Sequence, residues 1–212
     1  MRSRRSSKAF WPPAFDRTMT IYLMRHGQTV WNVQRRLQGR RDSPLTAIGV
    51  AQAEAFGRRL ATLEDAKNCR LVASSLVRSW QTAVIAAAKM GREATEIELD
   101  DRLVEHAFGE WEGLLWEEVK RDHAASLAAR MADRWNTPAP GGESYGDVAR
   151  RVEAWLRDIE GPAPVAAFCH GVTSRVVRGL YGGLSQEETM ALAEPQDRIF
   201  LLQDGKVEEI EV

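Results

Sequence analysis

The sequence predicts an α/β fold, specifically a three-layer α/β/α sandwich with a mostly parallel central sheet. Three short apolar runs, at residues 20–24, 70–73 and 165–168, each end abruptly in polar residues and are followed by a helical pattern. Runs of branched and aromatic residues bounded by polar clusters are typical of strands. Repeated strand-to-helix units favour a parallel sheet with helices on both faces. Because crossover connections are right-handed, we expect the carboxyl ends of these three strands to share one edge of the sheet.

The composition is that of a single globular domain of ordinary size. The chain has 212 residues, of which 44% are hydrophobic and 28% are charged, and its formal net charge is −1. Such a chain can bury a full core, and its charge gives no sign of a nucleic-acid or membrane partner. No apolar run approaches the roughly 18 residues that a membrane-spanning helix needs. Cys69 and Cys169 form no disulfide framework or metal-binding spacing, so we expect a reducing, cytoplasmic location. For the oligomeric state we expect a monomer or homodimer.

The first 18 residues differ from the rest of the chain. They contain five basic residues and one acidic residue, whereas residues 19–212 contain 24 basic and 29 acidic residues. A signal peptide needs an apolar core after its charges, and this segment has none. We therefore expect a basic, flexible extension at 1–18 and a single domain at 19–212. Met19 leaves open a translation start directly before the first strand.

The first strand-to-helix unit runs from residue 20 to about residue 63. After the strand, a polar segment opens a helix, and a turn-rich loop follows at 38–44. Thr46 is the expected N-cap of the next helix. That helix has apolar residues on one face at Phe56, Leu60 and Leu63.

The second unit begins with the strand at 70–73. Ser74 and Ser75 are expected to cap the helix that follows. The buried stripe expected for this helix consists of Leu76, Trp80, Ala83, Val84 and Ala87. A short strand is expected at 95–99, followed by a loop at 100–113 that is rich in acids, aromatic residues and glycine. Residues 114–135 are helical in composition, and we expect a small helical insertion over the sheet at about 106–143.

The last third of the chain supplies the third unit and a hairpin. Ser144 and Asp147 have capping-box spacing at the start of a helix. Its apolar stripe consists of Tyr145, Val148, Val152, Trp155, Leu156 and Ile159, and Gly161-Pro162 ends it. The strand at 165–168 runs into Cys169-His170-Gly171 and a further helix with Val172, Val176, Val177 and Leu180. Residues 199–202 and 207–210 flank Asp204-Gly205 and predict a terminal hairpin.

Charged and nucleophilic side chains gather at the predicted sheet edge. Arg25 and Arg78 each offer a planar guanidinium that can hold two phosphate oxygens, and helix N-termini add backbone donors. A neutral His26 could attack phosphorus and form a phosphohistidine, while His170 would stabilise the phosphoryl oxygens. Gly27 would let the backbone approach a ligand closely. The edge therefore indicates phosphoryl transfer.

Five stretches resemble, in the same order, blocks of the histidine phosphatase superfamily, the phosphoglycerate mutase-like enzymes. Residues 23–32 (LMRHGQTVWN) are similar to its signature, and residues 74–83 (SSLVRSWQTA) to the block with a second phosphate-binding arginine. Residues 103–113 (LVEHAFGEWEG) resemble the block whose first glutamate is the proton donor. Residues 141–144 (GGES) and 169–172 (CHGV) match later blocks. The resemblance covers about residues 19–185.

This resemblance implies roles for individual residues. His26 would be the nucleophile and Glu105 the acid and then the base. The phosphate pocket would consist of Arg25, Asn32, Arg78 and His170. The other residues expected to bind substrate or phosphate are Gly27, Gln28, Gln38, Gly39 and Gly171. No metal or organic cofactor is implied, and the sequence contains no HExxH motif, P-loop or clustered Cys/His spacing. The implied partners are a small phosphorylated substrate and inorganic phosphate as product, with no nucleic acid and no membrane.

The same pocket serves phosphatases and phosphoglycerate mutases. A mutase retains a doubly charged intermediate, which favours further cations near the acid loop. Residues 105–113 contain three acids and no lysine or arginine, so this block resembles the phosphatase branch, including the α-ribazole and broad-specificity phosphatases. We therefore expect a phosphomonoester hydrolase of the histidine acid phosphatase type. A phosphoglycerate mutase, or a phosphoprotein or phosphohistidine phosphatase, is the alternative. A phosphate-binding relative without activity is disfavoured because every expected residue is present.

Several side chains could have either a structural or a catalytic role. Glu110 and Glu112 could compete with Glu105 for the role of acid, but the motif position favours Glu105. Cys169 is better explained as the end of a buried strand than as a nucleophile. His106 and His123 are expected to be surface or loop residues. Trp111, Trp116 and Trp135 fit either the core or an apolar substrate wall, and the sequence does not separate these readings.

Overall fold

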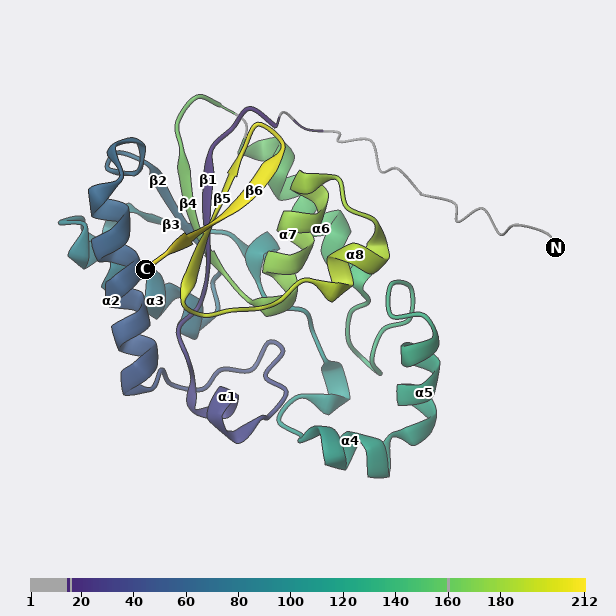
Figure 1. The fold of residues 1–212 in the computed structure, drawn as a ribbon. Helices are drawn as coiled ribbons and strands as arrows, with labels where there is room; N and C mark the ends of the chain where they lie inside the picture. Colours follow the sequence, from purple (N-terminus) through teal and green to yellow (C-terminus); the bar gives the residue numbers. More distant parts are fainter. Residues whose placement is uncertain (1–14, 16, 160) are drawn as a thin grey trace.

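A six-stranded mixed sheet forms the centre of the part of the chain that the structure describes. The computed structural model describes residues 15, 17–159 and 161–212, and its strands lie in the order β3-β2-β4-β1-β5-β6 (Figure 1). The strands are β1 (Ile21–Arg25), β2 (Arg70–Ala73), β3 (Ile97–Leu99), β4 (Val165–Cys169), β5 (Arg198–Gln203) and β6 (Lys206–Glu211). The first four strands in this order pair in parallel, and β5 joins β1 in an antiparallel pair. The mostly parallel sheet and the β5–β6 hairpin are confirmed.

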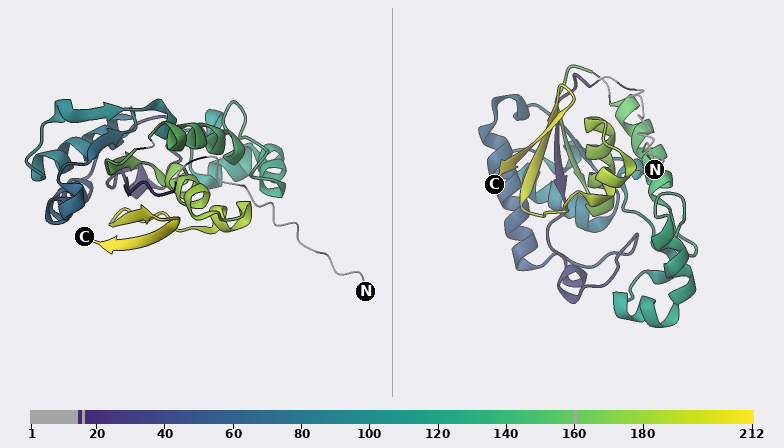
Figure 2. Two further views of the ribbon diagram at one scale, coloured as in Figure 1. Left: turned by 90° about the horizontal axis from the view of Figure 1, so that it is seen from above. Right: turned by 45° about the vertical axis from the view of Figure 1, so that its right-hand side comes forward.

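Helices cover both faces of the sheet, as the three-layer prediction requires. α2 (Ala47–Thr62) and α3 (Val77–Lys89) lie on one face, and α6 (Tyr145–Asp158) and α7 (Gly171–Gly182) lie on the other (Figures 1 and 2). α8 (Gln186–Ala191) packs against α7. The remaining helices, α1 (Val30–Gln34), α4 (Trp116–Asp122) and α5 (Ala124–Ala132), lie beyond the carboxyl ends of the strands (Figure 1). Four 3₁₀ turns occur at Glu64–Ala66, Ala94–Glu96, Asp101–Leu103 and Gly109–Trp111 in the described residues.

The alternation of side chains along β1 divides the core into two parts. Ile21 and Leu23 belong to the cluster under α6 and α7, whereas Tyr22 and Met24 belong to the cluster under α2 and α3. Successive side chains of a strand point to opposite faces, so a strand with helices on both sides needs apolar residues at every position. This requirement explains why the predicted strand is a continuous apolar run.

The start of α6 agrees in detail with its sequence pattern. The Ser144 side chain accepts a hydrogen bond from the backbone of Asp147, and the Asp147 carboxylate accepts one from the backbone of Ser144. All the apolar residues assigned to its stripe are buried: Tyr145, Val148, Val152, Trp155, Leu156 and Ile159.

The start of α3 differs from its prediction. Ser74 and Ser75 do not cap the helix; its N-cap is Leu76, and the Asp42 carboxylate accepts from the backbone N–H of Val77 and Arg78 at 3.0 and 3.3 Å. Trp80, expected in the buried stripe, is 40% exposed. The inner face of α3 instead uses small residues because α2 packs closely against it. A Cβ added at Gly57 of α2 would lie 2.2 Å from the carbonyl oxygen of Ala86.

α4 and α5 fall within the range of the predicted helical insertion but do not lie over a face of the sheet. They extend past its carboxyl-end edge (Figures 1 and 2). A separate cluster of Leu37, Trp111, Val119 and Ala139 packs in this region. The prediction of helices over the sheet is therefore wrong, because this segment packs its apolar side chains on neighbouring loops. The limits of the insertion and the single-domain assignment stay predictions.

Helix α8 and the packing of Phe15 and Arg17 were not predicted from the sequence. α8 begins at a capping box of Ser185 and Glu188, a signal that was present in the sequence. Residues 1–14 and 16 of the expected basic extension lie outside the described residues. Phe15 is buried against Tyr181, and the Arg17 guanidinium donates to the carbonyl oxygen of Leu180. In the described part of the chain, no helix combines the length and apolarity needed to cross a membrane.

We predict that Ser144→Ala lowers the free energy of unfolding by about 1 kcal/mol, because the substitution leaves an N-terminal N–H of α6 without its acceptor. Urea denaturation monitored by circular dichroism measures the effect. Ser144→Thr keeps a hydroxyl acceptor and is the matched control. Equal stability of the alanine and threonine variants would show that the capping box contributes nothing.

Candidate active site

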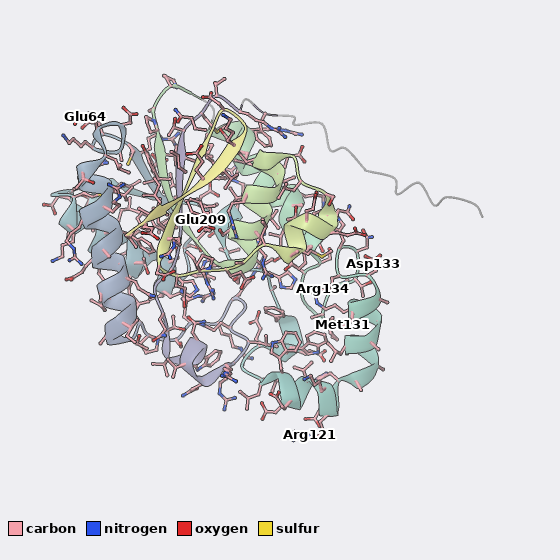
Figure 3. All side chains as sticks on the ribbon, in the orientation of Figure 1. Glu64, Arg121, Met131, Asp133, Arg134 and Glu209 are labelled. Atoms are coloured by element: carbon pink, nitrogen blue, oxygen red, sulfur yellow. The ribbon has the colours of Figure 1, made fainter. Side chains whose placement is uncertain are left out.

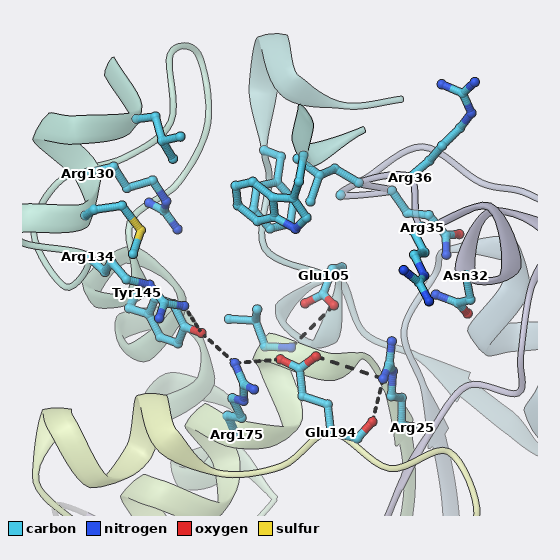
Figure 4. Close-up of a pocket in the computed structure, with 18 of the residues that line it drawn as sticks. Arg25, Asn32, Arg35, Arg36, Glu105, Arg130, Arg134, Tyr145, Arg175 and Glu194 are labelled. Atoms are coloured by element: carbon cyan, nitrogen blue, oxygen red, sulfur yellow. Dashed lines mark hydrogen bonds and ion pairs between the residues drawn. The ribbon is translucent and has the colours of Figure 1, made fainter. Parts of the chain in front are cut away.

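The predicted residues converge at the carboxyl-end edge of the sheet. His26 follows β1, Arg78 lies in the first turn of α3, and His170 precedes α7. The rings of His26 and His170 have their centroids 5.1 Å apart, and Arg78 Nε donates to His26 Nε2 at 3.2 Å. A cavity of about 870 Å³ opens here, lined by Arg25, His26, Arg78 and Glu105 among others (Figure 4). The common edge inferred from right-handed crossovers is thus present.

His26 is buried, neutral and held in one tautomer. Its Nδ1 lies 2.8 Å from the carbonyl oxygen of Gly27, which can only accept, so Nδ1 carries the proton and Nε2 carries the lone pair. Burial, followed by the charges of Arg78 and Arg25, lowers the pKa of His26 well below its ordinary 6.5. The ring is therefore an uncharged nitrogen base at neutral pH, with Nε2 on the side of Arg78.

His170 is also buried and uncharged. Its Nε2 lies 2.8 Å from the hydroxyl of Ser74, the residue expected to cap α3. Burial and the Arg78 charge lower the pKa of His170 well below 6.5. Its Nδ1 is buried and has no hydrogen-bond partner among the described residues. His170 lies against the ring of His26 but is absent from the cavity lining.

Arg78 is fixed by four acceptors. Besides His26, its guanidinium donates to the carbonyl oxygens of Gly39 and Arg41 at 2.7 and 2.8 Å and to the Asp42 carboxylate at 2.8 Å. The side chain is buried. A guanidinium has five N–H groups, so these bonds leave one N–H for a ligand and a second, on Nε, that a ligand could take from His26.

Arg25 is held by a residue that the sequence reading did not identify. Its Nη1 donates to the carbonyl oxygen of Glu194 at 2.5 Å and lies 3.9 Å from the Glu194 carboxylate. Its Nε is buried without a partner among the described residues. In Figure 4 Glu194 lies between Arg25 and Arg175.

The Glu105 side chain is buried, and its carboxyl group lies at the N-terminus of α7. Oε1 accepts from the backbone N–H of His106 at 2.9 Å and of Thr173 at 3.3 Å, and Oε2 accepts from that of Val172 at 3.4 Å. Burial, followed by the charge of Glu194, raises the pKa of Glu105 above its ordinary 4.5. Glu105 lines the cavity, whereas the competing acid Glu112 accepts from the backbone N–H groups of Arg40 and Phe108.

Asn32, which was assigned to the phosphate pocket, lines the cavity together with Gln38 and Gly39. The Asn32 Oδ1 atom accepts from the backbone of Thr29 at 3.0 Å and from the Gln196 amide at 3.1 Å, which directs its Nδ2 group away from these donors. Gln38 Nε2 donates to the Thr29 hydroxyl at 2.7 Å, and its Oε1 is buried without a partner among the described residues.

Gln28, Gly27 and Gly171 do not line this cavity. The Gln28 carboxamide oxygen accepts from the Thr46 hydroxyl at 2.9 Å, at the N-terminus of α2. A Cβ at Gly27 would lie 2.3 Å from the carbonyl oxygen of Gly49, so the close approach that requires glycine is to α2 rather than to a ligand. A Cβ at Gly171 would lie 2.7 Å from the Glu194 carboxylate.

The cavity also contains cations that the sequence reading missed. Residues 105–113 contain no lysine or arginine, but other segments direct six basic residues at the cavity: Arg35, Arg36, Lys120, Arg130, Arg134 and Arg175. Arg134 and Met131 both come from the α5 region (Figure 3). The acid loop itself has no lysine or arginine, as the sequence shows, and the basic residues approach the cavity from the regions of α1, α4, α5 and α7 instead. The helical spacing of Leu127, Arg130, Met131 and Arg134 was the available signal.

Several neighbouring residues are structural. His106 is fully buried, contrary to the expectation of a surface residue; burial and the Arg130 charge lower its pKa to about 3. Its Nε2 accepts from Arg130 at 3.0 Å. Cys169 ends a buried strand as expected, and burial raises the pKa of its thiol to about 12. Of the three tryptophans left open, Trp111 and Trp135 are buried and Trp116 lines the cavity.

Comparison with known proteins identifies a family match over most of the chain. The family model described as the histidine phosphatase superfamily (branch 1) matches residues 21–199. A bifunctional protein of Mycobacterium tuberculosis is 38% identical over 142 residues, which are 67% of this chain and 37% of that protein. The chain thus spans little more than a third of the first curated relatives it matches.

Two further relatives match over larger shares of their own length. The glucosyl-3-phosphoglycerate phosphatase of M. tuberculosis is 34% identical and aligns with 83% of this chain and 76% of its own. A 2,3-bisphosphoglycerate-dependent phosphoglycerate mutase of Methylobacterium is 31% identical, over 79% of this chain and 82% of its own.

Solved structures support the same fold. The structure of a mycobacterial glucosyl-3-phosphoglycerate phosphatase with VO3 superposes with a TM-score of 0.73 at 27% identity, covering 92% of this chain and 97% of that one. The α-ribazole phosphatase from Shigella flexneri has a TM-score of 0.77 at 23% identity and covers 92% and 96% of the two chains.

We predict that three buried histidines make the protein less stable as the pH falls below about 6.5. The unfolded chain takes up protons on His26, His106 and His170 in this range, whereas the folded protein, with lowered pKa values, does not. Each histidine should contribute about 1.4 kcal/mol per pH unit. Glu105 acts in the opposite direction because its pKa is raised, but one carboxyl opposes three imidazoles.

Urea denaturation at several pH values between 7 and 5 measures this slope. His106→Gln retains an acceptor for Arg130 and should reduce the histidine contribution by about a third. A free energy of unfolding that is constant over this range would contradict the prediction.

Proposed function

The chain belongs to the histidine phosphatase superfamily, and we propose that it hydrolyses small phosphomonoesters through a phosphohistidine formed on His26. The observation that carries the proposal is the tautomer of His26. Its proton is on Nδ1, bound to the Gly27 carbonyl oxygen, so the Nε2 lone pair is available on a buried, uncharged ring. Nucleophilic catalysis by histidine requires this form.

In the first step, the phosphate dianion binds between Arg25 and Arg78, with the Asn32 amide as a further donor. A phosphate oxygen replaces His26 Nε2 as the acceptor of the Arg78 Nε–H, which releases Nε2 for attack. A bond forms between Nε2 and phosphorus as the bond to the leaving oxygen breaks. His170 donates toward the developing charge, and Glu105 gives its proton to the leaving oxygen.

In the second step, water attacks the phosphohistidine. The water oxygen bonds to phosphorus as the bond between phosphorus and His26 Nε2 breaks. At the same time the Glu105 carboxylate accepts a proton from this water. Inorganic phosphate leaves, and His26 and protonated Glu105 are restored. The raised pKa of Glu105 supports both roles, because a carboxyl that titrates nearer to neutral pH can give and take the proton.

The cavity favours a small substrate. Its volume of about 870 Å³ is in the range of small-molecule sites. The basic residues around it, together with Trp116 and Leu127, suit an anionic metabolite with an apolar part. A phosphoprotein or phosphohistidine substrate is the alternative. We further propose a cytoplasmic monomer or homodimer; the two free, buried cysteines are compatible with a reducing compartment.

The choice between hydrolase and mutase cannot rest on the acid loop alone, since other segments supply cations to the cavity. Sequence identity does not separate them, since the phosphatase relative is 34% identical and relatives named as mutases are 31% and 35% identical. The structural similarity to a glucosyl-3-phosphoglycerate phosphatase, which covers 92% of this chain and 97% of that one, supports hydrolysis. If the purified protein is inactive on a broad panel of phosphoesters but interconverts 2- and 3-phosphoglycerate after addition of 2,3-bisphosphoglycerate, the reaction is that of a mutase. Phosphate binding without either activity would indicate a non-enzymatic relative.

We predict that the purified protein releases phosphate from p-nitrophenyl phosphate in the presence of EDTA. His26→Ala should lower kcat by roughly a thousandfold or more, because no other group can form the phosphoenzyme. His123→Ala, which changes a histidine outside the cavity, is the control. Acid-labile phosphate on the quenched wild-type protein, absent from the His26 variant, would identify the intermediate. A His26 variant that is correctly folded and fully active would exclude this mechanism.

We also predict that Glu105→Gln slows hydrolysis of alkyl phosphates by about 10²- to 10⁴-fold, since an alkoxide needs a proton to leave. p-Nitrophenolate leaves without protonation, so its phosphate ester should be affected much less in the first step. The ratio of kcat/KM for the two esters measures the effect. Glu110→Gln, which changes an exposed acid of the same loop, should leave the ratio unchanged. An unchanged ratio in Glu105→Gln would assign the proton to another group.

A further inference from the structure

Hydrogen bonds hold the segment of residues 192–196 against α7 and against the carboxyl end of β1. The carbonyl oxygens of Leu192 and Ala193 accept from arginines of α7 at 2.5 and 2.6 Å. The Glu194 carbonyl oxygen accepts from Arg25, and the Gln196 amide donates to the His26 carbonyl oxygen at 3.0 Å. This segment, which follows α8, thus connects α7 to the carboxyl end of β1.

Glu194 directs its carboxylate into the cavity from this segment. Oε1 lies 2.9 Å from Arg175 Nη1, and Oε2 lies 3.9 Å from Arg25 Nη1 (Figure 4). Oε2 also lies over Gly171, where an added Cβ would be only 2.7 Å away. Glu105 accepts from the next two backbone N–H groups of the same helix. Two carboxyl groups therefore share the N-terminus of α7.

We propose that Glu194 is a positioning residue of the phosphatase reaction, which holds Arg25 at the phosphate site and keeps the proton on Glu105. The inference rests on the proposed function. The Glu194 carboxylate, between Arg25 and Arg175, restricts the Arg25 guanidinium through Nη1, whereas the Arg25 Nε has no partner among the described residues. The negative charge beside Glu105 disfavours a second negative charge there, as in other paired carboxyl groups.

The charges around Glu105 indicate why this second effect is needed. Arg25 from β1 and Arg78 from α3 both lower the pKa of Glu105, as does the His106 backbone N–H. The donors of α7 also favour the ionised form. Burial of the Glu105 carboxyl group raises its pKa, and the neighbouring negative charge of Glu194 raises it further. Three further titratable groups lie nearby and are uncharged, namely Cys169 at the end of β4, His170 before α7 and His26 after β1. Arg175 on α7 is paired with Glu194.

Glu194→Gln tests the proposal because it removes the charge and keeps the shape and the backbone bond to Arg25. With an alkyl phosphate, the alkaline limb of kcat/KM should move to lower pH by about half a unit to one unit, and activity above this limb should fall about three- to tenfold. With p-nitrophenyl phosphate, which does not need the proton, the limb should stay in place. Inhibition by inorganic phosphate should weaken in parallel, because Arg25 is less well held.

Glu194→Asp retains the charge and should restore the position of the alkaline limb. Glu187→Gln removes an exposed acid from α8 and is the charge-matched control. A merely structural role would lower activity with both esters equally and leave the limb in place, which would overturn the proposal.

A second measurement separates failure of this inference from failure of the proposed function. The Glu105 carboxyl can be titrated by ¹³C NMR, with its resonance assigned by its loss in Glu105→Gln. The pKa should be lower in Glu194→Gln than in the wild type whether or not the protein is a phosphatase. An active wild type with equal Glu105 pKa values in both proteins would refute the role of Glu194 alone. A wild type inactive on all esters would refute the proposed function.

Discussion

The arrangement of the site depends on the hydrogen bonds of one buried guanidinium, that of Arg78. Arg78 donates to His26, to two carbonyl oxygens of the loop at residues 39–41 and to Asp42, while the Asp42 carboxylate in turn accepts from the first turn of α3. A charge taken out of water is tolerated only when its hydrogen-bonding groups are satisfied, so these acceptors are needed in their places. One side chain thereby orders the loop, fixes the helix start and helps to keep His26 uncharged.

Elements whose stability depends on local chemistry could be predicted from the sequence. The capping box of Ser144 and Asp147, the apolar stripe of α6 and the hairpin at Asp204-Gly205 are specified within a few residues of each other. The convergence of His26, Arg78 and His170 could also be predicted, because the handedness of crossovers and the parallel sheet bring these strand ends to one edge. Each of these inferences needs only residue type, spacing and chain direction.

Features that depend on contacts between distant segments could not be predicted in this way. Asp42 caps α3 from a loop 35 residues earlier, which displaces the expected serines. Close packing of α2 selects small residues on α3 and leaves Trp80 partly exposed. The basic residues of the cavity come from four helical segments, and Glu194 acquires its importance only where α7 and β1 meet. A motif identifies the residues that react, whereas tertiary packing determines their environment.

The position of β1 has a consequence for the order in which the protein can assemble. β1 pairs with β4 on one side and β5 on the other, so Ile21 contacts Val165 and Leu202. A ribosome makes this mostly apolar strand before the other strands of the sheet, and it makes β4 and β5 only after β2 and β3. Contacts so distant in sequence close slowly, and an unpaired apolar strand is prone to aggregation until they do. The nascent chain is therefore prone to aggregation at β1, the strand that later positions His26. A chaperone that binds this segment would protect both the fold and the site.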